Sequence, residues 1–369
     1  MLIIKTYKYR LRLSKSQKET IDNWINTSRA IYNVALETKI NAYQTHRVSL
    51  SKFDLMRQLT QCRSEFDWVS SVPVGTLQDV IERMDKAYQT FFKGGGFPNW
   101  ARKDKYNSIT FKSVEQISDY VFKLPKIGTV SIFKDRQPKG DLRRATIVKE
   151  NNKYYISILT IQEYEPKSLP SDSQVGIDVG LVYFATLSTG EHIDNPRHTK
   201  RYEKQLRIEN RSLARKVKGS NNRTKQKLVV QKLHTKIRNC RKDFVHKQSS
   251  YIVNNFSLIA VEDLKVKNMI KFGHLAKHIN DASWSEFFRQ LEYKSDWYGN
   301  TFVKVEPKYT SQTCSNCSHV DSNSRISQSK FVCTKCGHSE NADINASKEI
   351  LKRGEGIANK RQRETLVCA

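Results

Sequence analysis

Four cysteines near the end of the chain restrict its possible folds more than any other feature. Cys314 and Cys317 form one C-x2-C pair, Cys333 and Cys336 form a second, and 15 residues separate the two pairs. Zinc takes four ligands in a tetrahedron, and two such pairs supply four thiolates at a suitable spacing. Because four protein ligands leave no position for water, we predict one structural zinc ion in a small ribbon.

The other cysteines and the chain's start indicate a reducing compartment. Cys62, Cys240 and Cys368 stand alone, and His319 and His338 are not needed as zinc ligands. A disulfide framework is typical of short secreted chains, whereas this chain has 369 residues. The start lacks a secretory signal, and no run approaches the roughly 18 apolar residues of a membrane helix. We therefore expect a cytoplasmic protein that does not span a membrane.

The charge balance indicates a polyanionic partner. The chain has 64 Lys and Arg against 37 Asp and Glu, a formal net charge of +27. About half of this excess lies in residues 200–247, which contain 17 Lys or Arg and three acids. Opposite charges that would pair along a solvated helix are nearly absent there, which favours phosphate contact. Nucleic acid is the expected partner, and a membrane surface is the weaker alternative.

The first half of the chain predicts a helical insert in a small β-barrel. Residues 3–12 are strand-like, and apolar residues recur at helical spacing in 14–38, 51–62 and 76–92. Ser14 and Gln17 match a capping box at the start of the first helical segment. Short β-rich runs separated by turns follow from 107 to 164. The basic and aromatic residues 91–103 could stack nucleobases or pack structurally, and both interpretations stay open. A Pro- and Ser-rich stretch at 166–173 is the expected linker.

The second half is typical of an α/β domain, because strand-like and helical segments alternate after residue 174. Two helices broken near Gly219 are expected within the basic region, another at 283–297, and a final helix near Asp343. The expected strands are 175–180, 182–187, 256–261 and 302–305.

Three carboxylates stand out by their context. Asp178 lies within the apolar run VGIDVG, where a charge is costly to bury without a partner. Glu262 follows the apolar run FSLIAV at an expected strand end, where sites collect in open α/β sheets. Taken alone, Glu262 could equally be a surface charge, Asp263 beside it is an alternative, and Asp343 could simply favour a helix start.

Together, the three acids indicate a metal-dependent nuclease. Phosphodiester hydrolysis uses two divalent cations about 4 Å apart that are held by carboxylates. Oxygen ligands of this kind suit Mg²⁺, with Mn²⁺ as a substitute. We therefore expect Asp178, Glu262 and Asp343 to be the catalytic metal ligands.

The whole chain resembles the TnpB family of transposon-encoded RNA-guided nucleases, which are related to type V CRISPR effectors. The resemblance is specific because the order and spacing of its motifs agree over nearly the whole length. These motifs are YKYRLRLSKSQKE, FFKGGGFPNW, VGIDVGLVYFATLSTG, IAVEDLKVKNM, WSEFFRQLEYKSDWYG, TSQTCSNC with CTKCG, and NADINASKEI.

The resemblance implies a multidomain α/β plus β-barrel fold. A wedge β-barrel would comprise residues 1–12 and 105–170, with a helical recognition lobe at 13–104. An RNase H-like RuvC nuclease domain would comprise 171–310 and 341–369, with the zinc ribbon at 311–340 inserted as the part that binds target nucleic acid.

The resemblance also implies an activity and its partners. The three acids match the catalytic carboxylates of the family, and the four paired cysteines match its ribbon. The expected function is Mg²⁺-dependent, RNA-guided cutting of double-stranded DNA beside a short transposon-adjacent motif. The guide RNA would come from the transposon end, and the protein would act as a single chain in a prokaryotic cytoplasm, on the nucleoid when bound to DNA.

Two departures from the family's pattern and two alternative functions remain. Asn99, Trp100 and Ala101 replace a more usual basic and aromatic continuation, and Ser318 replaces a frequent glycine after the second cysteine.

The alternatives are an RNA-guided DNA-binding repressor that does not cut and a miniature type V CRISPR effector. The presence of all three acids favours the nuclease over the repressor.

Overall fold

The computed structural model describes residues 1–103, 105–133, 135–165, 169–170, 173–271 and 273–367. These residues form two compact units, Met1–Tyr164 and Glu165–Ala369. Cys368 and most of the expected linker lie outside the described residues. Among the described residues, no helix has both the length and the apolar character to cross a bilayer.

The first unit contains a seven-stranded sheet in the order β2-β6-β7-β1-β5-β4-β3. The first strand, β1, is its centre, because it pairs antiparallel with β7 along most of its length and with β5 at its end. No pairing that would close this sheet into a ring occurs among the described residues, so the barrel stays a prediction. The strands are β1 (Leu2–Arg12), β2 (Ser108–Phe111), β3 (Glu115–Ser118), β4 (Val121–Leu124), β5 (Gly128–Ile132), β6 (Asp141–Glu150) and β7 (Lys153–Glu163).

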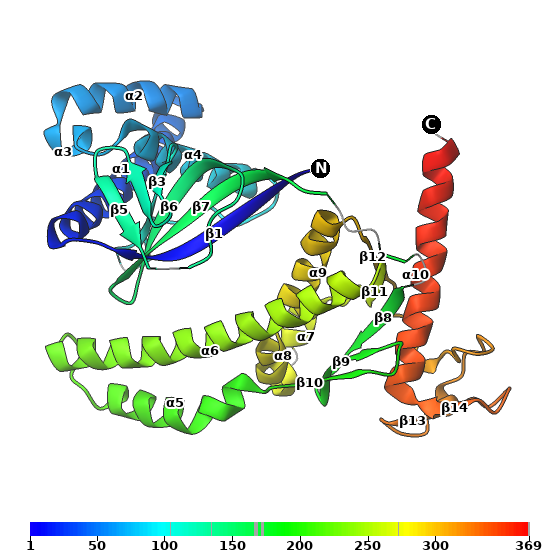
Figure 1. Ribbon diagram of the computed structural model, residues 1–369. Coiled ribbons are helices and arrows are strands. Elements are labelled where there is room, and N and C mark those ends of the chain that lie inside the picture. The colour runs from blue at the N-terminus through cyan, green and yellow to red at the C-terminus, as the bar shows by residue number, and fades with distance from the viewer. Residues whose placement is uncertain (104, 134, 166–168, 171–172, 272, 368–369) are drawn as a thin grey trace. The chain divides into compact units, whose positions relative to one another are not determined.

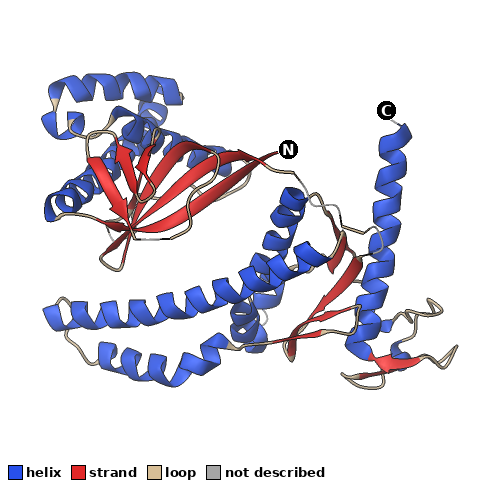
Figure 2. Ribbon diagram, in the orientation of Figure 1, coloured by secondary structure: helices blue, strands red, loops and turns tan. Residues whose placement is uncertain are grey.

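The four helices of the first unit lie between β1 and β2 in the sequence, and Figure 2 shows them grouped beside the sheet. They are α1 (Lys15–His46), α2 (Lys52–Glu65), α3 (Asp67–Ser70) and α4 (Val74–Phe92). Ser14 caps α1 together with Gln17, as the sequence predicts, but the helix runs eight residues beyond the expected end. The apolar stripes of α1 and α4 bury against the sheet, where the ring centroids of Trp24 and Phe111 lie 6.2 Å apart.

The second unit is built on a five-stranded mixed sheet in the order β10-β9-β8-β11-β12. Strand β11 lies between β8 and β12 and is parallel to both, whereas β9 is antiparallel to β8. The strands are β8 (Gln174–Val179), β9 (Tyr183–Leu187), β10 (His192–Asp194), β11 (Leu258–Glu262) and β12 (Thr301–Val305). A separate hairpin joins β13 (Lys330–Val332) to β14 (Ser339–Asn341).

Helices cover both faces of this sheet (Figure 1). Residues of odd number in β8 and β11 pack against α6 and α9, whereas Ala260 and Leu258 pack on the side of α10. The basic region forms a hairpin of α5 and α6, broken at the glycine that the sequence indicates. The helices are α5 (His198–Ala214), α6 (Asn221–Asn255), α7 (Val266–Lys271), α8 (Ala276–Ala282), α9 (Trp284–Tyr298) and α10 (Ala342–Val367), with 3-10 turns η1 (Gly273–Leu275), η2 (Thr310–Gln312) and η3 (Ser322–Ser324).

Candidate metal sites

The pairing of β8 with β11 brings two of the three acids side by side. Gly176 pairs with Ala260, and Ile177 pairs with Val261. The next step in this parallel register places Asp178 opposite Glu262. Side chains in register on neighbouring strands point to the same face about 4.8 Å apart, so two acids from distant parts of the sequence share one edge of the sheet.

Close packing of α10 on the sheet brings the third acid to the same edge. A Cβ atom on Gly176 would lie 2.0 Å from the carbonyl oxygen of Ser347, and one on Gly354 would lie 2.4 Å from the Cβ of Ala260. Glycine at both positions therefore lets the helix backbone touch the strands. Asp343 lies in the first turn of α10, one turn before Ser347, and its charge acts on Asp178.

The charges of the other two acids act on Asp178, although the ligand oxygens of the three acids do not all lie within 4.8 Å of one another. The pKa of Asp178 is raised to about 8, first by burial and then by the charges of Glu262 and Asp343, while Arg325 opposes the shift. Burial also raises the pKa of Glu262. A buried cluster of like charges is costly unless a cation joins it, and carboxylate oxygens suit Mg²⁺ or Mn²⁺.

The structure distinguishes Glu262 from Asp263, which the sequence left as alternatives. Asp263 follows the last residue of β11, and its carboxylate, which is 47% exposed, pairs with Lys265 at 2.5 Å. Glu262 is half-buried and accepts a hydrogen bond from the Thr310 hydroxyl. The two neighbouring acids therefore differ in exposure and in partner, and the charge of Glu262 adds to burial in raising the pKa of Asp178.

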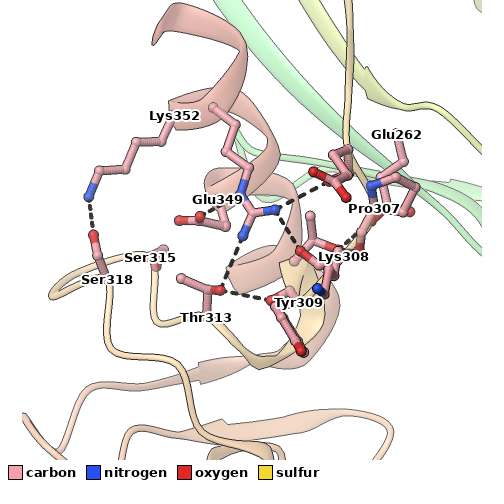
Figure 3. Close-up of polar contacts among 12 residues, drawn as sticks. Glu262, Pro307, Lys308, Tyr309, Thr313, Ser315, Ser318, Glu349 and Lys352 are labelled. Atoms are coloured by element: carbon pink, nitrogen blue, oxygen red, sulfur yellow. Dashed lines mark hydrogen bonds and ion pairs between the residues drawn. The ribbon is translucent and has the colours of Figure 1, made fainter.

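Two arginines that sequence reasoning missed hold the surroundings of this edge. Arg353 on α10 donates to Glu349 at 2.8 Å and to the carbonyl oxygen of Lys308 at 2.8 Å, which fastens the segment that carries Thr310 (Figure 3). Its positive charge also lowers the pKa of Glu262. Arg325 donates to Asp343 at 3.2 Å. No signal short of the tertiary contacts identifies either arginine.

The paired cysteines form the second candidate site. The Sγ atoms of Cys314 and Cys336 lie 3.8 Å apart, and those of Cys317 and Cys333 lie 3.6 Å apart. A tetrahedral zinc with bonds of about 2.3 Å requires sulfur atoms about 3.8 Å apart. Within the part of the chain that the structure describes, these four are the one group of three or more possible ligands whose ligating atoms all lie within 4.8 Å of one another. They fit one zinc ion.

The two halves of the ribbon share one backbone conformation, which explains a departure from the family's pattern. The residue after each C-x2-C pair is left-handed, with φ 60° at Ser318 and 71° at Gly337. A non-glycine residue is uncommon there, which is why glycine is frequent at the first position. Ser318 instead accepts a hydrogen bond from Lys352 of α10 at 2.6 Å.

The ribbon is tied directly to the helix that carries Asp343. Asn345, fully buried one turn into α10, donates to the carbonyl oxygen of Thr313 at 2.8 Å and accepts from the N–H of Ser315 at 2.9 Å. Asn345 lies within the motif NADINASKEI, but sequence reasoning missed its role in linking α10 to the cysteine-bearing segment. Gly354 is a signal that the sequence does offer. A glycine inside a helix costs up to about 1 kcal/mol, so its presence suggests close packing.

Three family models match the chain in succession. A helix-turn-helix domain of IS605 OrfB proteins matches residues 1–47, the IS605 OrfB model described as "Probable transposase" matches 157–272, and the Cas12f1-like TNB domain matches 284–350.

Similar proteins cover nearly the whole chain. The "Putative RNA-guided DNA endonuclease InsQ" of Escherichia coli K12 is 32% identical over 96% of this chain and 93% of its own length. A "Putative RNA-guided DNA endonuclease" of Streptomyces pristinaespiralis is 29% identical over 95% of this chain and 89% of its own length.

The fold is also found in a solved structure. A Cas12f1 protein, determined in a complex with guide RNA and target DNA, is similar with a TM-score of 0.63 and 12% identity over 95% of this chain and 98% of that one. At this identity the likeness shows the fold alone. The motifs, the family models and the relative that is 32% identical along nearly the whole length agree, and the chain therefore belongs to the TnpB family.

Proposed function

We propose that this chain is an RNA-guided endonuclease that cuts double-stranded DNA beside a short transposon-adjacent motif. The relatives named as RNA-guided DNA endonucleases support this activity. The structural support for the proposal is the parallel register that places Asp178 opposite Glu262, together with the charge of Asp343 acting on Asp178. The second unit would be the RuvC-type nuclease with the ribbon inserted in it, and the first unit would be the wedge with its helical recognition lobe.

The three acids would hold two Mg²⁺ ions, which supply an activated water and stabilise the leaving oxygen when bound. This chain's own part is to keep the ligands in place: β8 and β11 fix two of them in register, and α10 presents the third. The Thr310 hydroxyl orients the Glu262 carboxylate by donating to one of its oxygens. The raised pKa of Asp178 means that a proton competes with the metal until a cation lowers that pKa.

The hairpin of α5 and α6 would grip nucleic acid. Helix α5 has no buried residue, so its basic side chains remain at the surface. Helix α6 anchors the hairpin by burying residues such as Val245 and Ile252 against the sheet. In proteins of this kind base pairing reads the sequence, and the protein supplies backbone contacts.

Cleavage by the purified chain with its copurified RNA tests the proposal. We expect DNA that matches the guide to be cut in Mg²⁺, and cutting to stop with a chelator. Asp178→Ala should retain RNA binding and lose cutting by at least roughly a thousandfold, the scale of losing a catalytic group. Asp263→Ala is the matched control, because it removes the neighbouring acid, which is exposed and pairs with Lys265, and it should cut normally.

Two results would contradict the proposal. If Asp178→Ala cuts as well as the unmodified chain, the metal ligands are assigned wrongly. If the unmodified chain binds matching DNA but never cuts it, the chain is the guided repressor. A guide encoded in a repeat array would indicate the miniature CRISPR effector instead, and sequencing the copurified RNA reveals its source.

A further inference from the structure

A basic cavity in the first unit lies far in sequence from the three acids. It measures about 260 Å³ and is formed by the end of β1, the residue after β5, the start of α1 and the turn between β6 and β7. Its lining includes four cationic side chains and, among the described residues, no acidic one. These cations are Arg10, Arg12, Lys18 and Lys153.

The two arginines differ from the neighbouring cation on the same strand face. Lys8, Arg10 and Arg12 alternate along β1 and are exposed. Lys8 is neutralised by Glu150 at 2.8 Å. Within the residues that the structure describes, neither Arg10 nor Arg12 makes an ion pair. Side chains two apart on a strand lie about 7 Å from each other, so their repulsion stays uncompensated.

A single aromatic ring orders both guanidinium groups. Phe133 follows β5 and lies opposite Arg10, to whose carbonyl oxygen its N–H donates at 3.0 Å. The guanidinium carbons of Arg10 and Arg12 lie 4.6 Å and 4.3 Å from the ring centroid. Stacking on one ring holds both planar donor groups at one cavity wall. The two guanidinium groups are therefore held in a defined arrangement by one shared ring.

Lysines complete the cavity from two other directions. Lys18 comes from the first turn of α1, and Lys153 follows a tight turn whose residues Asn151 and Asn152 both have positive φ. The nearby Asp22 is already engaged, since it accepts hydrogen bonds from Lys149 at 2.6 Å and from the Tyr154 hydroxyl at 2.8 Å. Its charge is therefore not available to the cavity's cations.

We propose that this cavity binds a backbone phosphate of an unpaired segment of RNA. Bidentate guanidinium groups match phosphate geometry, and four unopposed cations attract a polyanion. The phosphates of a straight duplex lie on a convex surface, whereas an unpaired strand can turn one phosphate inward into a cavity. The inference rests on the proposed function in one respect, namely that the protein binds RNA.

The test measures binding of the full-length chain to its copurified RNA, resynthesised, as a function of salt. Replacing Arg10→Gln and Arg12→Gln together should lower the magnitude of the salt slope by about 0.7, since one phosphate contact to a single strand contributes about that much. Ethylation of one or two adjacent phosphates should block binding by the unmodified chain. The same ethylations should not affect the double variant.

A matched control separates this site from general basicity. Arg143→Gln with Arg144→Gln removes two exposed arginines from the same sheet, away from the cavity, and should leave the interfering phosphates unchanged. Phe133→Leu keeps every charge but removes the shared ring, so it should weaken the same phosphate contacts, whereas Phe133→Tyr should keep them. Lys18→Gln combined with Lys153→Gln should weaken the same phosphate contacts.

Each contrary result has a separate meaning. If the control pair removes the same interference, or if Phe133→Leu changes nothing, the cavity is not a built phosphate site. If interference appears on single-stranded DNA of the same sequence but not on RNA, the assignment to RNA is wrong. If RNA binds but no phosphate depends on the arginines, this inference alone fails; if no RNA binds at all, the proposed function fails with it.

Discussion

The two candidate metal sites of the second unit are assembled in opposite ways. The ribbon takes all four thiolates from residues 314–336, and two local turns of the same shape position them. The carboxylate site takes its acids from β8, β11 and α10, which are far apart in the sequence. The sulfur atoms already lie at zinc distances, whereas the oxygens of the three acids do not all lie within 4.8 Å of one another, and burial followed by the charges of the other two acids raises the pKa of Asp178 to about 8.

This difference shows how each site depends on the rest of the fold. The ribbon needs its metal more than it needs the sheet, because small zinc sites contribute folding energy outright. The carboxylate site needs the sheet and α10 first, because no local turn brings its ligands together. Ribbon and sheet nevertheless meet at α10, through Asn345 and Arg353.

Removing the zinc should produce the largest effect. If it does not, the comparison between the zinc site and the carboxylate site fails. Cys333→Ser should abolish zinc binding and unfold the ribbon, since such sites contribute about 10–16 kcal/mol of apparent binding energy at pH 7. Hydrogen exchange should accelerate in residues 314–341 while β8 and β11 stay protected. Cys240→Ser, a single cysteine outside the ribbon, is the control and should keep its zinc by elemental analysis.

Separating α10 from the sheet should act on the carboxylate site alone. Gly176→Ala places a methyl group against backbone atoms of Ser347, so overpacking should cost roughly 1–3 kcal/mol or more and displace Asp343. Chemical unfolding should show the loss, cutting should fall and zinc content should not change. Gly356→Ala on the same helix has nothing within 4 Å of the added atom and should be neutral or slightly stabilising.

The smallest expected effect concerns the free energy of unfolding that is lost because Asp178 is buried near two other acids. A carboxyl whose folded pKa is raised to about 8 destabilises the metal-free fold progressively as pH rises from about 4 to 8. Asp178→Asn should therefore raise the stability of the metal-free protein at pH 7.5, by less than the roughly 5 kcal/mol that the full rise in pKa would give, because burying the amide of Asn also costs free energy. The difference from the unmodified chain should vanish near pH 4.

Adding Mg²⁺ should reverse the order of stability of the unmodified chain and Asp178→Asn. The unmodified chain should gain stability by linkage to the bound ion, and Asp178→Asn should gain little. Equal stabilisation of both proteins by Mg²⁺ would show that Asp178 does not hold the metal.

Local periodicity predicted most elements of this protein well, and their ends less well. The Ser14 capping box marked the start of α1, and Gly219 marked the break between α5 and α6. The end of α1 was missed by eight residues, because Thr38 looks like a weak helix former but lies in a helix stabilised by packing of its apolar face. The turns that hold the four thiolates are equally local.

The sequence by itself determined which acids, cysteines and basic segments this protein has, because spacing along a chain sets helix, strand and turn. Tertiary structure decided which of them meet. Neither strand order nor register is written in the local pattern, since any strand can hydrogen-bond to any other. Only the parallel pairing of β8 with β11 put Asp178 beside Glu262, while Asp263, one residue past the strand, pairs with Lys265 instead.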